Sequence, residues 1–330
     1  MFPNLSLVES VNALVDWVVT HWGGFFHALS ADMLRFVLIP LGQFLTAIPP
    51  YLFIALVGLL AWQATRRWQA SLGIMLALFL IGSFGLWSKL MLTTSLMLVS
   101  TLLSVVIGLP VGILIARSNR LRSVVLPVLD VMQTMPSFVY LIPVLMLFNL
   151  GQVPAIFATV IYAVPPLIRL TDLGIRQVDS EVLEAARAFG TTPRQMLFGV
   201  QLPLARPSIM AGINQTVMMA LAMVVLASLI GARGLGEDVL TGINTLNVGL
   251  GLQAGLAIVI LAIVIDRITQ GYGMDSRLRR QLLARRRRSG RSSSATLPER
   301  IPAPPLPDTA STVNSTNTVS AANTVNEVKA

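Results

Sequence analysis

The sequence contains no cysteine and little charge. The absence of cysteine from all 330 residues excludes disulfides, iron–sulfur clusters and thiolate metal sites. Charged residues make up 12% of the chain, whereas a soluble domain carries about 25%. Hydrophobic residues make up 54%, and the mean hydropathy is +0.74. These values predict an all-α, polytopic membrane protein.

The sequence also has little that could perform chemistry. It contains no G-x-x-x-x-G-K-[S/T] phosphate loop, so we expect no ATP hydrolysis by this chain alone. Its two histidines, His21 and His27, have no carboxylate at ligand spacing, and we interpret them as surface residues. No Ser-His-Asp pattern or metal-ligand cluster is apparent. The sequence therefore predicts a protein that is not an enzyme and holds no metal or cofactor of its own.

The net charge of +9 is concentrated near the C-terminus, which argues against a nucleic-acid partner. Residues 277–291 contain eight arginines and no acidic residue. This segment could bind anionic lipid headgroups at the cytoplasmic face, or it could serve only to fix the topology. Residues 292–330 are rich in Ser, Thr, Asn, Ala and Pro, so we expect them to be disordered. We treat 277–330 as a cytoplasmic tail.

Residues 1–40 are predicted to form an extracytoplasmic, amphipathic segment. Leu7, Val11 and Leu14 recur at helical spacing, but Glu9 and Asp16 make the helix too polar to span a membrane. We expect this helix to lie on the outer surface of the membrane. The alternative is a helix packed against the bundle.

Residues 41–276 are predicted to be the transmembrane domain, with about seven spans. The expected spans lie near 43–63, at 71–88, at 90–115 with a kink at 108–112, twice within 123–168 around a turn at 149–154, at 208–230, and in a last run ending at Ile265. If the polar segment 179–206 is cytoplasmic, alternation places 21 of the 24 lysines and arginines inside. The N-terminus is then outside and the C-terminus inside.

The segment 179–206 carries strong helix punctuation. Asp179-Ser180 can cap a helix, and Gly190 suits its C-terminal end at positive φ. Thr192, Pro193 and Gln195 form a capping-box pattern that starts a second helix, with Pro203 just beyond its end. Helices of about ten residues are too short to be stable alone, so each must pack within the chain or on a partner.

One pattern of spaced residues occurs in this segment. Glu184-Ala185-Ala186 is followed, after three residues, by Gly190, and after nine more residues by an aliphatic residue, one further residue and Leu-Pro, here Val200-x-Leu202-Pro203. This pattern resembles the EAA loop of the membrane subunits of ABC importers, with one departure at Val200, where isoleucine is commoner. The resemblance implies the type I ABC importer permease fold and a separate cytoplasmic ATPase that binds ATP with Mg²⁺.

Other segments resemble the permeases of glycine betaine/proline betaine importers. They are Leu129-Asp130-x-Met132 to Val139-Tyr140-Leu141-x-Pro143, Pro165 to Thr171, Gln195 to Phe198, and Met210-Ala211-Gly212-x-Asn214-Gln215-Thr216. The resemblance covers roughly residues 40–276. It implies a homodimer in the cytoplasmic (inner) membrane, two ATPase subunits, and an extracytoplasmic binding protein that delivers a compatible solute for osmoprotection. The related substrates choline and carnitine stay open, as does another small solute.

The resemblance also implies roles for single residues. Glu184 would contact a groove of the ATPase, Gly190 would set the angle between the two helices, and the remaining coupling residues would be Ala185, Ala186, Phe189, Leu202 and Pro203. The expected substrate path contains Gln133, Thr134, Met135, Pro136, Phe138, Tyr140, Asn214, Gln215 and Met218. Aromatic faces and methionines suit a quaternary ammonium group, although such residues also serve simply in helix packing.

An ion-coupled secondary transporter is the alternative from a different class of protein. Such a transporter needs ionisable groups near the middle of the bilayer. Asp130 is the candidate that we find within the predicted spans, and it lies close in sequence to Arg122 near the cytoplasmic face. We therefore interpret Asp130 as structural.

Overall fold

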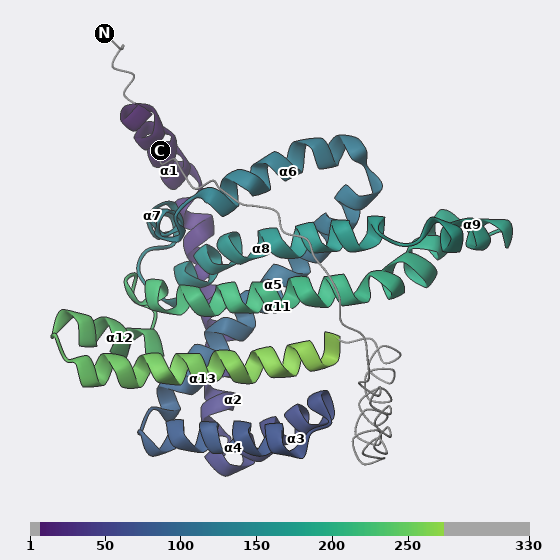
Figure 1. Ribbon diagram of the computed structural model, residues 1–330. Helices are drawn as coiled ribbons and strands as arrows, with labels where there is room; N and C mark the ends of the chain where they lie inside the picture. Colours follow the sequence, from purple (N-terminus) through teal and green to yellow (C-terminus); the bar gives the residue numbers. More distant parts are fainter. Residues whose placement is uncertain (1–6, 274–330) are drawn as a thin grey trace, which may run out of the picture. The chain divides into compact units, whose positions relative to one another are not determined.

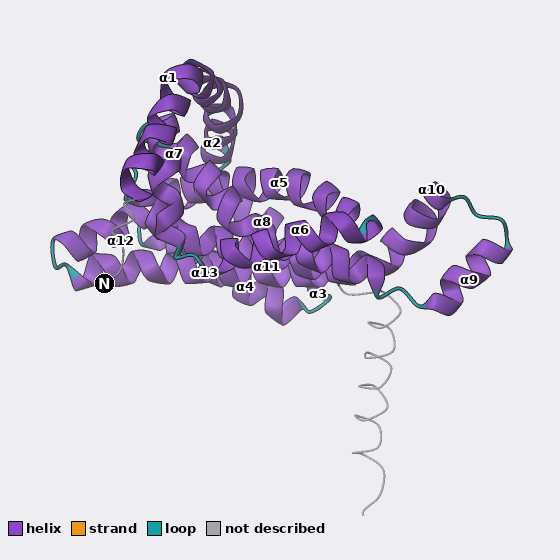
Figure 2. Ribbon diagram, turned by 90° about the horizontal axis from the view of Figure 1, so that it is seen from above, coloured by secondary structure: helices purple, strands orange, loops and turns teal. Residues whose placement is uncertain are grey.

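The computed structural model of the chain describes residues 7–273. These residues form helices joined by short turns, with no strand in this range (Figures 1 and 2). The all-α prediction is confirmed. The basic segment 277–291 and the tail 292–330, for which we predicted lipid contact and disorder, lie outside the described residues.

The N-terminal part is a helix that runs beyond the predicted segment 1–40. Helix α1 (Leu7–Met33) continues through a π-helical turn (η1, Leu34–Leu38) into α2 (Ile39–Ala47). The stretch Val8–Ala47 is long and apolar enough to cross a membrane, which our estimate for residues 1–40 alone did not anticipate. However, α1 and α2 cross the direction of α8, α11 and α13 (Figure 1), so the two sets cannot both lie along the membrane normal.

The predicted first span, 43–63, is wrong because the helix is interrupted inside it, between Ala47 and Pro50. Ile48 is extended, at φ −69° and ψ 125°, since a residue that precedes proline disfavours the helical region. Pro50 then starts α3 (Pro50–Thr65), which packs against α4 (Trp68–Ser83). Each has 16 residues, or about 24 Å of helix, which is shorter than a hydrocarbon core of about 30 Å.

Helix α5 (Trp87–Arg117) contains the whole predicted span 90–115, with Pro110 inside the helix. A further difference from the predicted spans occurs at Pro136. Helix α6 (Asn119–Thr134) is followed by a 3₁₀ turn (η2, Ser137–Tyr140) and α7 (Leu141–Phe148), with a bend of 108°. Met135 is extended before Pro136, so the first of the two helices expected in 123–168 is broken. The turn at Asn149 and Gly151 is confirmed by their positive φ angles.

Helix α8 (Gln152–Arg176) lies at the centre of the bundle between α5 and α11 (Leu202–Ser228). Helix α13 (Val248–Gly273) packs on α11, on α3 and on the short helix α12 (Leu235–Asn244). Within residues 7–273, five helices are long and apolar enough to cross a membrane, or six if α6 and the bent segment after it form one span. The predicted seven included the short helices α3 and α4.

Candidate functional site

Helix α9 (Ser180–Ala188) projects from one end of the bundle, together with the start of the helix that follows it (Figures 1 and 2). The Asp179 carboxylate accepts a hydrogen bond from the Glu181 amide at 3.0 Å and so caps the helix. Gly190 follows the helix at φ +75°. Both predictions for this helix are confirmed.

The predicted start of the second helix at Thr192 is also confirmed. The Thr192 hydroxyl accepts from the Gln195 amide at 3.4 Å, and the Gln195 side chain accepts from the Thr192 amide at 2.9 Å. Pro193 occupies the first helical position. This reciprocal capping box satisfies two amides that the helix itself cannot pair.

The predicted end of this second helix is wrong. The three-residue α10 (Pro193–Gln195) leads into a π-helical segment (η3, Met196–Gln201) and then into α11, so one helix runs from Pro193 to Ser228. Pro203 lies inside it rather than beyond it. Proline lacks an amide hydrogen, and its ring clashes with the carbonyl of the preceding turn. The π-helical segment directly before Pro203 is a local widening of the kind that accommodates such a break.

The coupling residues are open to solvent. Helix α9 contains no buried residue; Glu184 and Ala185 are exposed, and Ala186 is half-buried. Phe189 is 90% exposed. Leu202 is half-buried and Pro203 exposed. Phe189 is therefore a large apolar side chain that packing within the described residues leaves uncovered.

The first group of predicted path residues lies around the bend between α6 and α7. Gln133, Thr134, Pro136 and Phe138 are exposed there, whereas Met135 is half-buried and Tyr140 buried. The Tyr140 hydroxyl donates to the Met132 carbonyl, and its ring lies 6.5 Å from the ring of Tyr162 on α8.

The second group lies on α11 and faces different neighbours. The Asn214 amide donates to the Asp266 carboxylate of α13 at 3.0 Å, and the Thr269 hydroxyl donates to Asn214. Gln215 and Met218 are exposed. The contacts of Asn214 thus lead to α13, while those of Tyr140 lead to α8, so the two groups contact different helices.

The structure also places carboxylates inside helices where we had expected only Asp130. Asp130 itself is exposed and pairs with Arg169 of α8. Asp172 is buried in α8, because that helix runs eight residues beyond the predicted end of the span at Ile168. Asp266 lies within α13. The i,i+4 spacing of Asp172 and Arg176 was the available sequence signal for the buried carboxylate.

Asp238 is a further buried carboxylate, in the short helix α12. It pairs with Lys89 near the start of α5. The adjacent Leu235 amide donates to the Thr93 hydroxyl of α5 at 2.8 Å. These contacts attach α12 to α5 at the end of the bundle that lies away from α9 (Figure 1).

Residues 108–272 match the family described as "Binding-protein-dependent transport system inner membrane component". The chain is 49% identical over 267 residues to the glycine betaine/proline betaine transport system permease protein ProW of Escherichia coli, covering 80% of this chain and 74% of that protein. It is 44% identical over 278 residues to the glycine betaine transport system permease protein OpuAB of Bacillus subtilis, covering 84% and 98%.

The chain is also 43% identical to the glycine betaine/carnitine transport permease protein GbuB of Listeria monocytogenes, over 83% of this chain and 98% of that protein. A solved structure of the MetNI methionine ABC transporter in an inward-facing conformation superposes with a TM-score of 0.50. It is 24% identical and covers 56% of this chain and 94% of that one. This likeness concerns the fold alone.

Proposed function

The chain belongs to the family of binding-protein-dependent transport system inner membrane components, and we propose that it is the membrane-spanning subunit of an ATP-driven importer of glycine betaine. Proline betaine or a related quaternary ammonium osmolyte is included in this proposal. The names of the similar permeases support the substrate class. The protein is a multi-pass membrane protein of the cytoplasmic (inner) membrane.

The observation that carries the proposal is the exposed α9 segment with its EAA pattern. Phe189 is 90% exposed, and no residue of α9 is buried. A nine-residue helix is too short to be stable in water without packing. Helix α9 contacts η3 of the same chain but buries no residue there, so we expect a partner surface to complete its packing. We propose that this partner is a separate ATPase subunit that binds ATP with Mg²⁺.

The chain connections of α9 suggest how its movement reaches the membrane. Three residues separate α9 from the end of α8 at Arg176, and on its other side the chain re-enters the helix that starts at Pro193 and includes α11. Helices α8 and α11 pack closely on each other. A displacement of α9 by the ATPase would therefore move two packed spans together, which would switch the permease between inward- and outward-facing states.

Specific roles follow for the coupling residues. Glu184 would make a charged contact in a groove of the ATPase, while Ala185, Ala186 and Phe189 would seat the helix there. Gly190, at φ +75°, sets the angle between α9 and the following helix. Leu202 and Pro203 lie where the second part of the segment joins α11. Each proposed role concerns force transmission and none concerns chemistry in this chain.

The substrate path remains a proposal based on residue type. Phe138 is 56% exposed, and together with Met135 and Tyr140 it offers aromatic and thioether surfaces that suit a trimethylammonium group. The side chains of Gln133 and Thr134 would donate hydrogen bonds to the carboxylate of a betaine. Since the Asn214 group faces other neighbours in one protomer, a continuous path would need a second copy of the chain or a different conformation. We accordingly propose a homodimer and an extracytoplasmic substrate-binding protein.

The test is uptake of radiolabelled glycine betaine by proteoliposomes. The permease is reconstituted alone, and then with its ATPase and binding protein. We expect uptake only with the full set and ATP, and competition by choline, carnitine and proline betaine then ranks the substrates. Uptake by the permease alone, driven by a sodium or proton gradient, would overturn the proposal and favour an ion-coupled transporter.

A further inference from the structure

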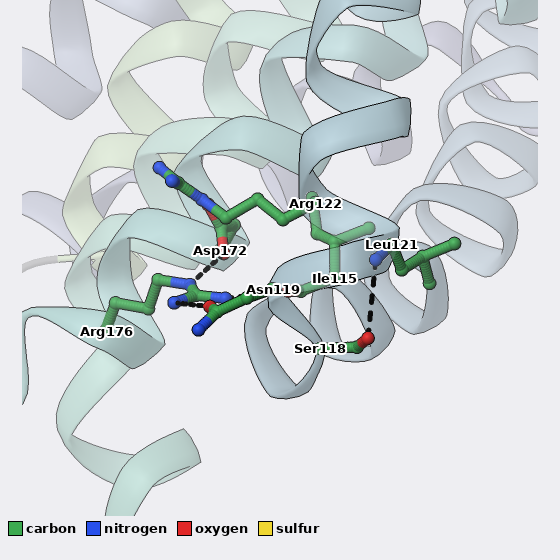
Figure 3. Close-up of polar contacts among 7 residues, drawn as sticks. All are labelled: Ile115, Ser118, Asn119, Leu121, Arg122, Asp172 and Arg176. Atoms are coloured by element: carbon green, nitrogen blue, oxygen red, sulfur yellow. Dashed lines mark hydrogen bonds and ion pairs between the residues drawn. The ribbon is translucent and has the colours of Figure 1, made fainter.

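A buried carboxylate near the end of α8 is shared by two arginines from different helices (Figure 3). One oxygen of Asp172 accepts from Nε of Arg122, on α6, at 2.9 Å. The other accepts from Nε of Arg176, one turn further along α8, at 2.7 Å. The Asp172 side chain is only 4% exposed, compared with 42% for Arg122 and 30% for Arg176. Both carboxylate oxygens are therefore paired with a guanidinium group.

Arg176 extends this cluster to the connection between α5 and α6. Its Nη1 donates to the Asn119 side chain at 2.8 Å, and its Nη2 donates to the Ile115 carbonyl at 3.0 Å (Figure 3). Ile115 lies in the last turn of α5, and Asn119 begins α6. Asp172 thus joins α8 to α6 directly, and to α5 through Arg176.

Close packing near Asp172 restricts movement of α8 relative to α5 and α11. A Cβ atom at Gly112 of α5 would lie 2.6 Å from Cβ of Thr171, and one at Gly174 would lie 2.6 Å from Cβ of Ser208 on α11. Helix α8 is therefore in close contact with α5 on one side and with α11 on the other. Because packed interiors transmit displacement with little compression, these helix segments should move as one body.

The position of the cluster makes it relevant to transport. Arg176 ends α8, and Asp179 caps α9 three residues later. On the other side, α6 leads from Arg122 to Gln133 and Thr134 and to the 108° bend that follows them. The cluster thus lies between the coupling segment and the residues that we place on the substrate path.

We propose that Asp172 is a positioning residue that makes the α5–α6 connection follow the movement of α9. The proposal rests on the importer function proposed above. Separation of α6 from α8 would leave a buried carboxylate short of one partner, which is costly in a low-dielectric interior. The two helices therefore stay joined while α9 moves, and the movement reaches α6 as well as α8.

Two variants test this role, and one matched variant controls for it. Asp172→Asn removes the shared charge. Arg122→Gln removes the direct link from Asp172 to α6 but leaves the contact of Arg176 with Asn119. Asp172 also keeps its i,i+4 pair with Arg176, so the fold is less at risk. Asp130→Asn makes the same chemical change as Asp172→Asn in an ion pair between the same two helices, but the Asp130 side chain is 62% exposed.

Each variant is assembled with the ATPase and the binding protein in proteoliposomes, and three quantities are measured: the yield of complex, the basal ATPase rate, and substrate transported per ATP hydrolysed. We expect Asp172→Asn and Arg122→Gln to assemble with a basal rate within about twofold of wild type, but to lose roughly tenfold in transport per ATP. The double variant should be no worse than Asp172→Asn alone, because both changes break one link. Asp130→Asn should transport normally.

Normal transport per ATP by Arg122→Gln would overturn the proposal. So would a parallel loss of complex yield and transport in both variants, because that pattern indicates a structural role only. If the proposed function itself is wrong, the result differs, because the wild-type complex then shows no ATP-dependent uptake at all. That result would also overturn the positioning role of Asp172.

Discussion

Helices α8 and α9 are neighbours in sequence but lie in opposite environments. Helix α8 has 25 residues, most of them buried between α5 and α11. Helix α9 has nine residues, none of them buried. Only residues 177–179 separate the two. The fold therefore places a mostly buried helix directly before a helix that buries no residue within the chain.

This contrast indicates a division of labour. A buried helix holds its position because each neighbour restrains it, so it can carry a displacement without deforming. An exposed short helix has low stability of its own, and it can dock on a partner without losing contacts inside the chain. The following changes test the contrast, from the one expected to affect the whole bundle to the one expected to affect a single contact with the ATPase.

Gly112→Leu should prevent assembly of the bundle. A Cβ atom at this position would lie 2.6 Å from Cβ of Thr171 and 3.0 Å from the Ile168 carbonyl oxygen, and a backbone atom cannot rotate away. We expect the yield of monodisperse protein in size-exclusion chromatography to fall about tenfold or more. Gly255→Leu in α13 is the control, since no atom lies within 4 Å of its added Cβ. Equal yields for the two variants would contradict the close packing of α5 on α8.

Gly190→Val should weaken coupling but leave the bundle intact. Gly190 has φ +75° and open space around it, so the cost arises from backbone strain alone, at about 1–2 kcal/mol. We expect normal yield with uptake reduced roughly tenfold, equivalent to about 1.4 kcal/mol. Gly190→Asn should restore most of the uptake, because asparagine tolerates positive φ. Normal uptake by the valine variant would show that this angle is not needed.

Phe189→Ala should weaken binding of the ATPase without affecting the permease itself. The side chain is 90% exposed, so its removal should change the stability of the permease by no more than about 0.5 kcal/mol. Burial of a phenylalanine in a partner groove contributes about 1.5–3 kcal/mol, and we expect a matching rise in Kd, measured by titration of ATPase onto permease in nanodiscs. Phe79→Ala, at a site 64% exposed on α4, is the control. Equal Kd values would remove Phe189 from the docking surface.

The sequence predicted local features well where their cause is local. The Asp179 cap, the positive φ of Gly190 and the capping box at Thr192 depend on residues within a few positions of one another. The same holds for the turn at Asn149 and Gly151. The break at Ile48 before Pro49 and Pro50 also has a local cause, whereas the long apolar run around it predicted a continuous helix.

Sequence reasoning failed where a helix end depends on its neighbours. A run of apolar residues ends at Ile168, and we placed the end of the span there. The helix instead continues to Arg176, because the charged side chain of Asp172 finds arginine partners on α6 and on its own helix. The continuation of the helix through Pro203 likewise depends on the π-helical segment before it, which no local pattern had indicated.

The amino-acid sequence by itself determined that this protein is helical and membrane-embedded, and that one polar segment carries the EAA pattern. These properties follow from composition, apolar periodicity and the short-range chemistry of caps. Only the tertiary structure decided that Asp172 is buried, that it joins the α5–α6 connection to α8, and that the predicted path residues face different neighbours. Those properties depend on contacts between residues about fifty positions apart, such as Arg122 and Asp172 or Asn214 and Asp266, and helix packing alone brings such residues together.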